Sequence, residues 1–218
     1  SATALHNKNK IKKIYDIFKN SNDEQNSSLD GSYDYNDGQP GDTEVLEKYL
    51  NKFTKPATLY YEGCSMTAIW GVRSLGIDPA TGQEMFLTKD GRSTYTWSSA
   101  DQVVIGDTSP KMSGTLNLNA GYKGFTFSAS CSYKFGGDLY NSELVARMEN
   151  INGQSNLDRR LFNAWQKVGD VAPYKVTVIS SGSTNYTKPT SRFVQKNNEL
   201  YISSVNVGYD VAGAAWLK

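Results

Sequence analysis

The sequence has few of the residues on which metal sites and nucleophilic catalysis depend. Its 218 residues include two cysteines, Cys64 and Cys131, and a single histidine, His6. Two cysteines are too few for a disulfide framework, and this residue set disfavours a zinc site. No P-loop, GxGxxG turn, GxSxG elbow or HExxH pattern occurs, and one histidine leaves little for Ser/His or Cys/His catalysis. We therefore expect no enzyme activity, no metal site and no cofactor.

An excess of one charge and a long apolar run are also missing. The chain has 23 basic and 22 acidic residues and a net charge of +1, so no strong field attracts nucleic acid or an anionic membrane surface, and we expect neither partner. No apolar run approaches the length of a transmembrane helix. The mean hydropathy of −0.54 and hydrophobic content of 38% are typical of soluble proteins. They also suit a barrel segment, because lumen and loop residues dilute its lipid-facing band.

What the sequence does contain is a pair of strictly alternating segments joined by a short turn, Lys123-Gly124. One face would carry Leu116, Leu118, Ala120, Tyr122, Phe125, Phe127, Ala129, Cys131, Tyr133 and Phe135. The other would carry Thr115, Asn117, Asn119, Thr126, Ser128, Ser130, Ser132 and Lys134. Because side chains alternate along a strand, this pattern predicts an antiparallel hairpin in which Gly114 to Tyr122 pairs with Phe125 to Phe135. In it Cys131 is a small apolar filler.

Two features of this hairpin favour a membrane over a protein core. Each arm has roughly the 9 to 11 residues that a tilted strand needs to cross a bilayer. Aromatic residues lie toward both ends of the apolar face, as in interfacial girdles, and Lys134 is the one charge on the polar face. Strands of a soluble sandwich alternate too, so a secreted β-sandwich ligand-binding module remains the alternative. A hydrolase, which needs clustered carboxylates in a cleft, is a third and weaker reading.

The first 59 residues predict helices and a polar loop. An apolar stripe over residues 1–20 predicts an amphipathic helix that covers a neighbouring surface: Leu5, Ile11, Ile14, Tyr15 and Phe18. Residues 21–42 are polar and carry no period, which predicts a loop. Its Asp30, Asp34 and Asp37 lack EF-hand spacing, so a solvated loop is favoured over a calcium site. Thr43 to Phe53 predicts a second short helix.

Two further segments predict turns. In GIDPATG, at 76–82, Asp78 can accept a hydrogen bond from the backbone two residues on, and Gly82 supplies a positive φ before a strand at Glu84 to Leu87. In GDTSPK, at 106–111, the proline ends one extended segment and begins the approach to the hairpin. Both segments are interpreted as structural turns.

Five short segments occur in order across residues 60–211: GIDPATG, GDTSPK, YKGF at 122–125, SRFV at 191–194 and NVGYD at 206–210. Together they resemble the C-terminal barrel region of SusC/RagA-like TonB-dependent outer-membrane transporters of Bacteroidetes. Residues 1–59 are similar only in kind, as a variable surface insertion. The resemblance implies an all-β fold, namely an antiparallel transmembrane β-barrel segment, an incomplete barrel, with large extracellular loops that carry short helices.

The resemblance also implies a function and partners. The chain would be a fragment of an importer for oligosaccharides or peptides, assembled with a SusD-like surface lipoprotein, surrounded by outer-membrane lipid and energised by TonB through a plug that this chain lacks. It begins at Ser1 without an initiator methionine or signal peptide and ends at Lys218, so we expect an interior piece. Aromatic loop residues could stack on sugar rings or act as buried loop anchors: Trp70, Tyr95, Trp97 and Trp165.

Loop length sets the expected orientation, because such barrels keep short turns in the periplasm and long loops outside. Three segments are expected outside the cell: a variable insertion with two short helices at 1–59, a loop and strand extension at 60–110, and a loop at 137–198. Two segments are expected in the membrane: a hairpin at 111–136, and a strand with its periplasmic end at 199–218. In the last strand, Leu200 to Val211, Val205, Val207, Tyr209 and Val211 would face lipid. Leu200 and Ile202 have the wrong parity, which predicts a bulge near Ser203 or a strand that continues above the membrane.

Overall fold

The computed structural model describes residues 1–30, 54–151, 158–176 and 186–211. The chain forms two compact units. The first, called the sheet unit, comprises Ser1–Asn9, Thr108–Asp138 and Lys196–Lys218. The second, called the loop unit, comprises Lys10–Asp107 and Leu139–Gln195. Among the described residues, no helix is both long and apolar enough to cross a membrane.

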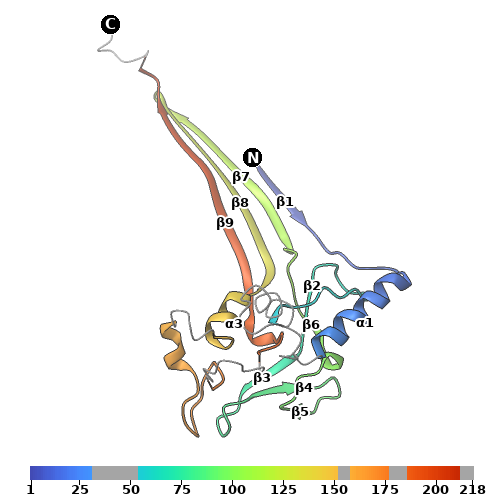
Figure 1. Ribbon diagram of the computed structural model, residues 1–218. Coiled ribbons are helices and arrows are strands. Elements are labelled where there is room, and N and C mark those ends of the chain that lie inside the picture. Colours follow the sequence, from blue (N-terminus) through green and yellow to red (C-terminus); the bar gives the residue numbers. More distant parts are fainter. Residues whose placement is uncertain (31–53, 152–157, 177–185, 212–218) are drawn as a thin grey trace, which may run out of the picture. The chain divides into compact units, whose positions relative to one another are not determined.

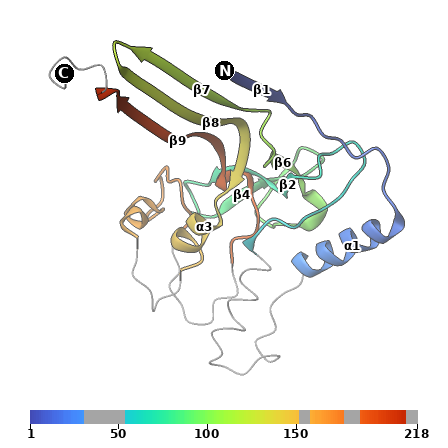
Figure 2. The same ribbon diagram turned by 90° about the horizontal axis from the view of Figure 1, so that it is seen from above.

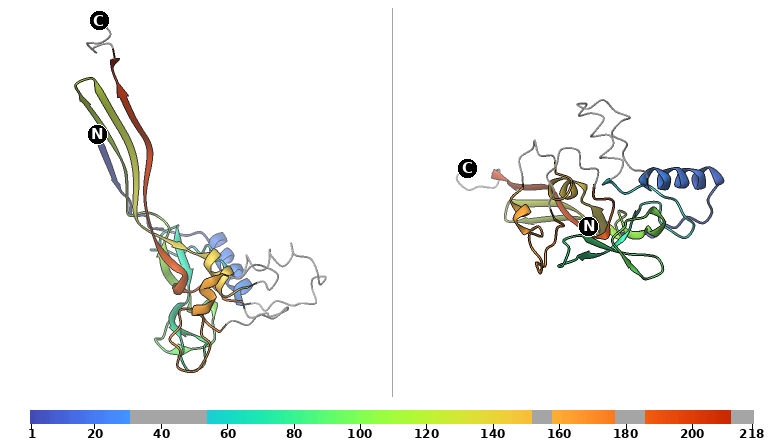
Figure 3. Two further views of the ribbon diagram at one scale, coloured as in Figure 1. Left: turned by 90° about the vertical axis from the view of Figure 1, so that its left-hand side faces the viewer. Right: turned by 60° about the horizontal axis from the view of Figure 1, so that its bottom comes forward.

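The sheet unit is built on a four-stranded sheet with the order β1-β7-β8-β9. Its strands are β1 (Ala2–His6), β7 (Met112–Tyr122), β8 (Phe125–Tyr140) and β9 (Val194–Tyr209). They lie side by side in Figure 1, in Figure 2 and in the left view of Figure 3. β7 pairs antiparallel with both β1 and β8. Contacts between β8 and β9 run in opposite chain directions, from Gly136 with Asn198 to Ser130 with Ser203, so this pair is antiparallel too.

The pairing of β7 with β8 confirms the predicted hairpin and its turn. Leu118 lies opposite Ala129 and Asn117 opposite Ser130, so apolar residues pair with apolar ones and polar with polar. The turn consists of Lys123 at φ 44° and Gly124 at φ 87°. Two consecutive left-handed residues make the two-residue turn whose twist matches that of paired strands. The alternation in the sequence therefore determines the two faces, and the two-residue turn fixes the register.

The two faces of this sheet differ in chemistry. On the polar face, hydrogen bonds cross from strand to strand: Thr3 Oγ1 with Thr115 Oγ1 at 2.8 Å, Ser130 Oγ to Asn117 Oδ1, and Asn206 Nδ2 to Ser128 Oγ at 3.3 Å. On the apolar face Leu118 is 50% exposed and Phe125 is 56% exposed. Near the turn, the rings of Phe125 and Tyr209 lie 4.5 Å apart. The apolar face therefore stays largely uncovered within the described chain.

The predicted amphipathic helix over residues 1–20 is wrong up to Tyr15, because the described helix begins only at Asp16. Ala2–His6 forms β1, in which Ala4 pairs with Gly114, and the Ser1 ammonium donates to the Asn117 carbonyl at 2.8 Å. Pairing with a neighbouring strand gives these backbone groups partners outside the segment, which overrides the local helical period. Pairing with β7 therefore decided that Ala2–His6 forms a strand and not a helix.

The helix α1 covers Asp16–Asp30, so the loop predicted over 21–42 is wrong for residues 21–30. The buried Asn22 explains part of this extension. Its side-chain amide donates to the Tyr60 carbonyl at 2.6 Å and accepts from the Tyr60 N–H at 2.9 Å. A polar side chain thereby fixes the helix to a distant segment. The predicted helix at Thr43 to Phe53, and Asp34 and Asp37, lie outside the described residues.

Strand β9 begins at Val194, six residues before the predicted Leu200. The strand therefore starts earlier than predicted and ends at Tyr209, two residues before the predicted Val211. The bulge near Ser203 and the continuation above the membrane both stay predictions. The side chains of Lys196 and Asp138 form an ion pair of 2.6 Å beside this early part of the strand.

The loop unit contains two small antiparallel sheets. One pairs β2 (Ala68–Gly71) with β6 (Val103–Asp107), and the other has the order β3 (Arg73–Ile77), β4 (Glu84–Leu87) and β5 (Ser93–Thr94). The predicted strand at Glu84 to Leu87 is confirmed. Besides α1, the unit has the helix α3 (Ser142–Met148) and the 3-10 helices η2 (Ser99–Asp101), η3 (Arg159–Asn163) and η4 (Ser191–Phe193).

The core of the loop unit joins residues from both of its chain segments. It comprises Ile69, Tyr140, Leu144, Val145, Met148 and Phe193. Helix α3 contributes Leu144, Val145 and Met148 to this core. The Asn141 side chain caps the start of the helix by accepting from the Leu144 N–H at 2.9 Å. Val145 and Met148 are fully buried. The connection from β1 to β7 and the connection from β8 to β9 therefore fold together into the loop unit.

Candidate functional site

The Asp78–Gly82 turn organises one region of the loop unit. Asp78 Oδ1 accepts from the Ala80 N–H at 3.0 Å, as predicted, and Asp78 Oδ2 accepts from Thr81 Oγ1 and from Tyr95 Oη, each at 2.8 Å. Gly82 has φ +70°, which confirms the positive φ expected from the sequence. Asp78 thereby holds the turn and attaches the Tyr95 phenol to it.

These hydrogen bonds change the acidity of both groups. The Ala80 N–H, followed by Tyr95 and Thr81, lowers the pKa of Asp78 below its ordinary value. The hydrogen bond to Asp78 raises the pKa of Tyr95 above its ordinary value. Donors favour the charged carboxylate, and a phenol that donates to a carboxylate resists losing its proton.

The same turn anchors a second segment, called the 158–176 loop. Trp165 Nε1 donates to the Pro79 carbonyl at 2.9 Å, and the Gly169 N–H donates to the same oxygen at 2.8 Å. A Cβ on Gly82 would come within 2.6 Å of the Trp165 ring. The indole therefore lies against the turn at a distance that only glycine permits.

The other two tryptophans predicted as ligand contacts lie elsewhere. Trp97 Nε1 donates to the Pro189 carbonyl at 3.1 Å, and the Lys188 ammonium lies 4.8 Å from the centre of its ring. Trp70 is 7% exposed and packs against Tyr61 with ring centres 4.9 Å apart. The structure therefore brings Tyr95 and Trp165 together at one turn and separates Trp70 and Trp97 from them.

A buried ionic cluster, which the sequence analysis did not predict, holds the other end of the 158–176 loop. Arg192 of the SRFV segment binds Glu84 through two hydrogen bonds of 2.7 and 2.6 Å and Glu149 through one of 2.9 Å. Arg192 also donates to the Pro173 carbonyl at 2.9 Å. Glu149 accepts from the Lys175 N–H at 3.1 Å. The cluster thus joins β4, the end of α3, the loop and η4.

The charges in this cluster stabilise one another. The Glu149 side chain is fully buried and that of Arg192 is 13% exposed. Burial alone would disfavour the charge on Arg192, but hydrogen bonds with Glu84 and the charge of Glu149 outweigh it and raise the pKa of Arg192. Burial lowers the pKa of Lys175, an effect that the two carboxylates oppose. Removing one partner would leave the others buried without compensation.

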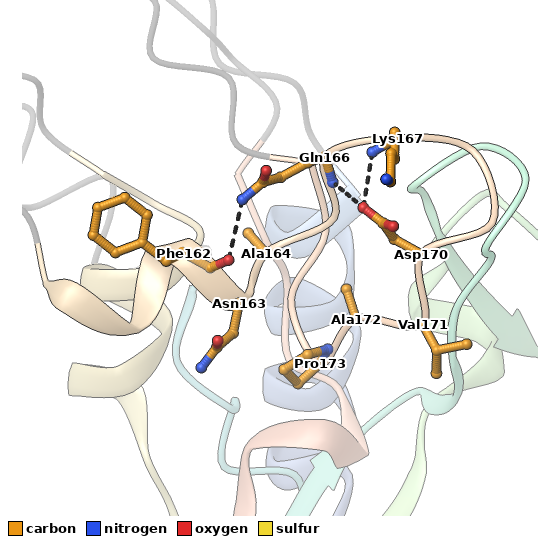
Figure 4. A pocket seen from close by; sticks show the side chains of 9 residues that line it. All are labelled: Phe162, Asn163, Ala164, Gln166, Lys167, Asp170, Val171, Ala172 and Pro173. Atoms are coloured by element: carbon orange, nitrogen blue, oxygen red, sulfur yellow. Dashed lines mark hydrogen bonds between the residues drawn. The ribbon is translucent and has the colours of Figure 1, made fainter.

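A surface hollow of about 500 Å³ lies along the 158–176 loop and is lined by nine residues between Phe162 and Pro173 (Figure 4). At its rim, Asp170 Oδ2 accepts from the backbone N–H groups of Gln166 at 3.2 Å and Lys167 at 3.0 Å. The Gln166 side chain donates to the Phe162 carbonyl at 3.1 Å. Alanine, valine and proline side chains are part of its lining (Figure 4). The sequence carried no recognisable signal for it, because the loop has neither period nor motif.

The described residues hold no group of three or more histidine, cysteine, aspartate or glutamate side chains placed to bind a metal ion. Both cysteines are free thiols. Cys131 lies opposite Leu116 in the hairpin, in the position expected for a small apolar filler.

Comparison with known proteins gives matches to a TonB-dependent receptor and to a peptide transporter. No family model matches the chain. The TonB-dependent receptor P3 of Formosa agariphila is 26% identical over 141 residues, which cover 65% of this chain and 13% of that receptor. The structure of the RagAB peptide transporter matches with a TM-score of 0.54 and 18% identity over 71% of this chain and 18% of the other. The RagAB peptide importer in its closed-closed state matches with a TM-score of 0.56 and 20% identity over 68% and 17%.

The chain thus spans less than a fifth of the length of each of these relatives. The matches confirm the resemblance to SusC/RagA-like TonB-dependent proteins and the antiparallel β fold that it implies. The match to a TonB-dependent receptor also supports the outer-membrane location that the resemblance implies. At sequence identities of 18% and 20%, the two solved structures show a similarity of fold alone. The relatives are named as a receptor and a transporter, which agrees with the expectation that the chain is not an enzyme.

Proposed function

We propose that this chain contributes barrel wall and external loops to an outer-membrane, TonB-dependent nutrient importer. The in-register sheet with one apolar and one hydrogen-bonded polar face carries this proposal. In the assembled barrel the apolar face contacts lipid and the polar face lines the lumen. A β-sandwich would instead bury the apolar face, whereas Leu118 and Phe125 are at least half exposed. The likeness to a TonB-dependent receptor supports the same assignment.

The proposed orientation places the Lys123-Gly124 turn in the periplasm and the loop unit outside the cell, because this turn is the short connection and the others are long. Residues 111–136 and 199–218 then lie in the membrane region, and 60–110 and 137–198 lie outside. Residues 1–59 belong to the external insertion, except that β1 (Ala2–His6) adds a strand beside β7. The external segments fold together rather than as separate loops.

In this role the whole protein imports an oligosaccharide or a peptide. A SusD-like surface lipoprotein binds the loop unit, and TonB acts through the plug of the complete receptor. Loops on a rigid scaffold carry recognition, because they can vary without disturbing strand pairing. Tyr95 remains a candidate ligand contact with an exposed ring, whereas Trp70, Trp97 and Trp165 serve as anchors through the contacts already described.

Orientation is the most direct test. In the full-length protein, with Cys64→Ser and Cys131→Ala as background, cells carrying Ser98→Cys or Lys123→Cys are treated with a membrane-impermeant maleimide. We expect Ser98→Cys to react in intact cells and Lys123→Cys to react only after the outer membrane is permeabilised. Labelling of Lys123→Cys alone in intact cells would show that the orientation is inverted.

The same two variants test the partner. With a short thiol cross-linker, Ser98→Cys should give adducts with the surface lipoprotein and Lys123→Cys should give none. Loss of TonB should abolish uptake of the nutrient by the wild-type protein. Uptake that continues without TonB would contradict the proposed importer function.

A further inference from the structure

The connection between β1 and α1, residues 7–15 (Figure 1), carries a local excess of positive charge. Residues 8–13 include no acidic residue and four lysines, all of them exposed: Lys8, Lys10, Lys12 and Lys13. None of the four forms an ion pair within the part of the chain that the structure describes. The net charge of the whole chain is only +1, so this excess is local, and it can attract an anion that the chain as a whole does not.

The backbone of this segment is fixed at its two isoleucines. The Ile11 N–H donates to the Cys64 carbonyl at 2.9 Å, and the Gly63 N–H donates to the Ile11 carbonyl at 2.8 Å. The Ile14 N–H donates to Glu62 Oε1 at 3.1 Å, and the Ile14 side chain is buried. The lysines between these anchors stay in solvent on a backbone that is already ordered. Binding through them therefore costs little backbone entropy.

Two carboxylates lie beside the segment. Glu62 accepts from the Ile14 N–H, and Asp16 forms an ion pair of 2.9 Å with Lys19. Residues 8–19 contain five lysines, so these two carboxylates leave a positive excess. The charge of the four unpaired lysines is therefore available to a partner.

Strand direction sets the level of this segment in the proposed barrel. In the proposed orientation β7 runs inward to the Lys123-Gly124 turn, and β1 is antiparallel to β7. β1 therefore runs outward and ends at His6, which pairs with Met112 at the external end of β7. An extended chain spans at most about 3.6 Å per residue, so Lys8 lies within about 7 Å and Lys10 within about 14 Å of that end. The headgroups of the outer leaflet lie at this level.

Exposed apolar side chains follow the lysines directly. Tyr15 is 71% exposed and Ile17 is 73% exposed, at the start of α1. Lysines next to exposed aromatic and aliphatic side chains are typical of a segment at a membrane interface, where ammonium groups bind phosphates and apolar groups enter the headgroup boundary. A free phosphate ion would bind the lysines but leave the apolar side chains in water. A phosphorylated lipid accounts for both features.

We propose that residues 8–17 bind the phosphate groups of anionic lipid in the outer leaflet of the outer membrane. The four lysine ammonium groups bind the phosphates, and Tyr15 and Ile17 enter the boundary between headgroups and acyl chains. This contact fixes the depth of the external end of β1 in the membrane. The assignment rests on the proposed orientation, which the maleimide labelling of Ser98→Cys and Lys123→Cys tests separately.

The test uses the full-length protein, purified in detergent and immobilised, and two probes: diphosphoryl lipid A and dephosphorylated lipid A. Lipid that is retained after washing is measured by mass spectrometry. We expect the wild type to retain about tenfold more of the diphosphoryl form than of the dephosphorylated form, since each lysine near a phosphate favours binding. This preference should weaken as added salt screens the charges.

Variants in the loop unit assign the preference to the lysines. The triple variant K10Q/K12Q/K13Q should retain the diphosphoryl form no better than the dephosphorylated form, whereas K10R/K12R/K13R should keep the preference because it keeps the charge.

The matched control removes three charges from other exposed lysines of the same unit, in the variant K55Q/K89Q/K167Q. It should keep lipid retention within about twofold of the wild type. Limited proteolysis of each variant verifies that the loop unit is folded.

Equal retention of the two lipids by the wild type, or an undiminished preference in the folded glutamine variant, would overturn the lipid assignment and leave the importer function standing. Loss of the surface lipoprotein from the glutamine variant, with lipid retention unchanged, would also overturn it and assign the lysines to a protein partner. An inverted orientation in the maleimide labelling would instead overturn the placement on which the assignment rests.

Discussion

The sheet unit and the loop unit are stabilised in different ways. In the sheet unit Leu118 and Phe127 lie on an open apolar face, whereas in the loop unit Val145 and Phe193 are almost completely enclosed. Side chains of the hairpin bond across strands through neutral groups, whereas Arg192 of the loop unit binds a carboxylate 108 residues away. The loop unit is therefore held by its own contacts. The sheet unit depends on whatever covers its apolar face, which in the proposed barrel is lipid.

The largest effect should follow from Arg192→Met, which leaves Glu84 and Glu149 buried without their cation. We expect the free energy of unfolding of the loop unit to fall by about 3 to 5 kcal/mol. Hydrogen exchange of the core amides around Val145, in the full-length protein, measures this change. The matched control is Arg147→Met, which breaks an exposed pair with Glu143 and should cost less than about 0.5 kcal/mol. Equal losses in the two variants would mean that the cluster contributes no special stability.

Arginine substitutions in the hairpin test whether its stability comes from lipid. Leu118→Arg or Phe127→Arg should cost about 2 to 4 kcal/mol in the folded barrel, because the charge would enter the bilayer. Asn117→Arg and Ser128→Arg should cost little, since those side chains face the lumen. Unfolding of the full-length protein in lipid vesicles by urea provides the measurement. Similar losses on both faces would indicate a protein core in place of lipid and lumen.

Substitutions at two glycines distinguish the stability cost of close packing from the cost of backbone strain. Gly82 at φ +70° faces the Trp165 ring, whereas Gly91 at φ +81° has nothing within 4 Å. Gly91→Ala should cost about 1 kcal/mol for the left-handed backbone alone. Gly82→Ala should cost a further 1 to 3 kcal/mol, roughly the cost of overpacking, and should loosen the 158–176 loop. Proteolysis rates in that loop measure the difference, and equal rates would contradict the proposed docking of Trp165 on the turn.

The smallest expected effect is the pH dependence of the Asp78–Gly82 turn. Because the pKa of Asp78 is lowered in the folded state, its carboxylate stabilises the turn above its ordinary pKa of 3.8, and this contribution is lost as the pH falls through the folded-state value. Hydrogen exchange across residues 78–82, corrected for its intrinsic pH dependence, should show the turn loosening as acid is added below about pH 4. Asp78→Asn should remove this dependence. A dependence that persists in the variant would assign it to another group.

Some elements of the fold could be predicted because their cause is local. The period of two in β7 and β8 sorts side chains to opposite faces, and a register shift of one residue would pair polar with apolar neighbours. The Lys123-Gly124 turn and the Asp78–Gly82 turn were predictable for the same reason, since each depends on backbone preferences of a few consecutive residues. The ligand contacts at Trp70, Tyr95, Trp97 and Trp165 stay predictions. The burial of Trp70 and the hydrogen bonds of Trp97 and Trp165 favour anchoring for the three tryptophans.

Other features depend on partners far away in the sequence. Nothing within Ala2–His6 distinguishes a strand from the start of a helix; pairing with β7 decided it. The Glu84, Glu149 and Arg192 cluster unites residues that have no pattern in common, and the hollow between Phe162 and Pro173 exists because that cluster and Trp165 hold its loop. The sequence by itself determined the alternating hairpin and its turns, because backbone geometry acts between neighbours. The tertiary structure alone decided the buried charges and the anchoring of the 158–176 loop, because burial is a property of the assembled fold.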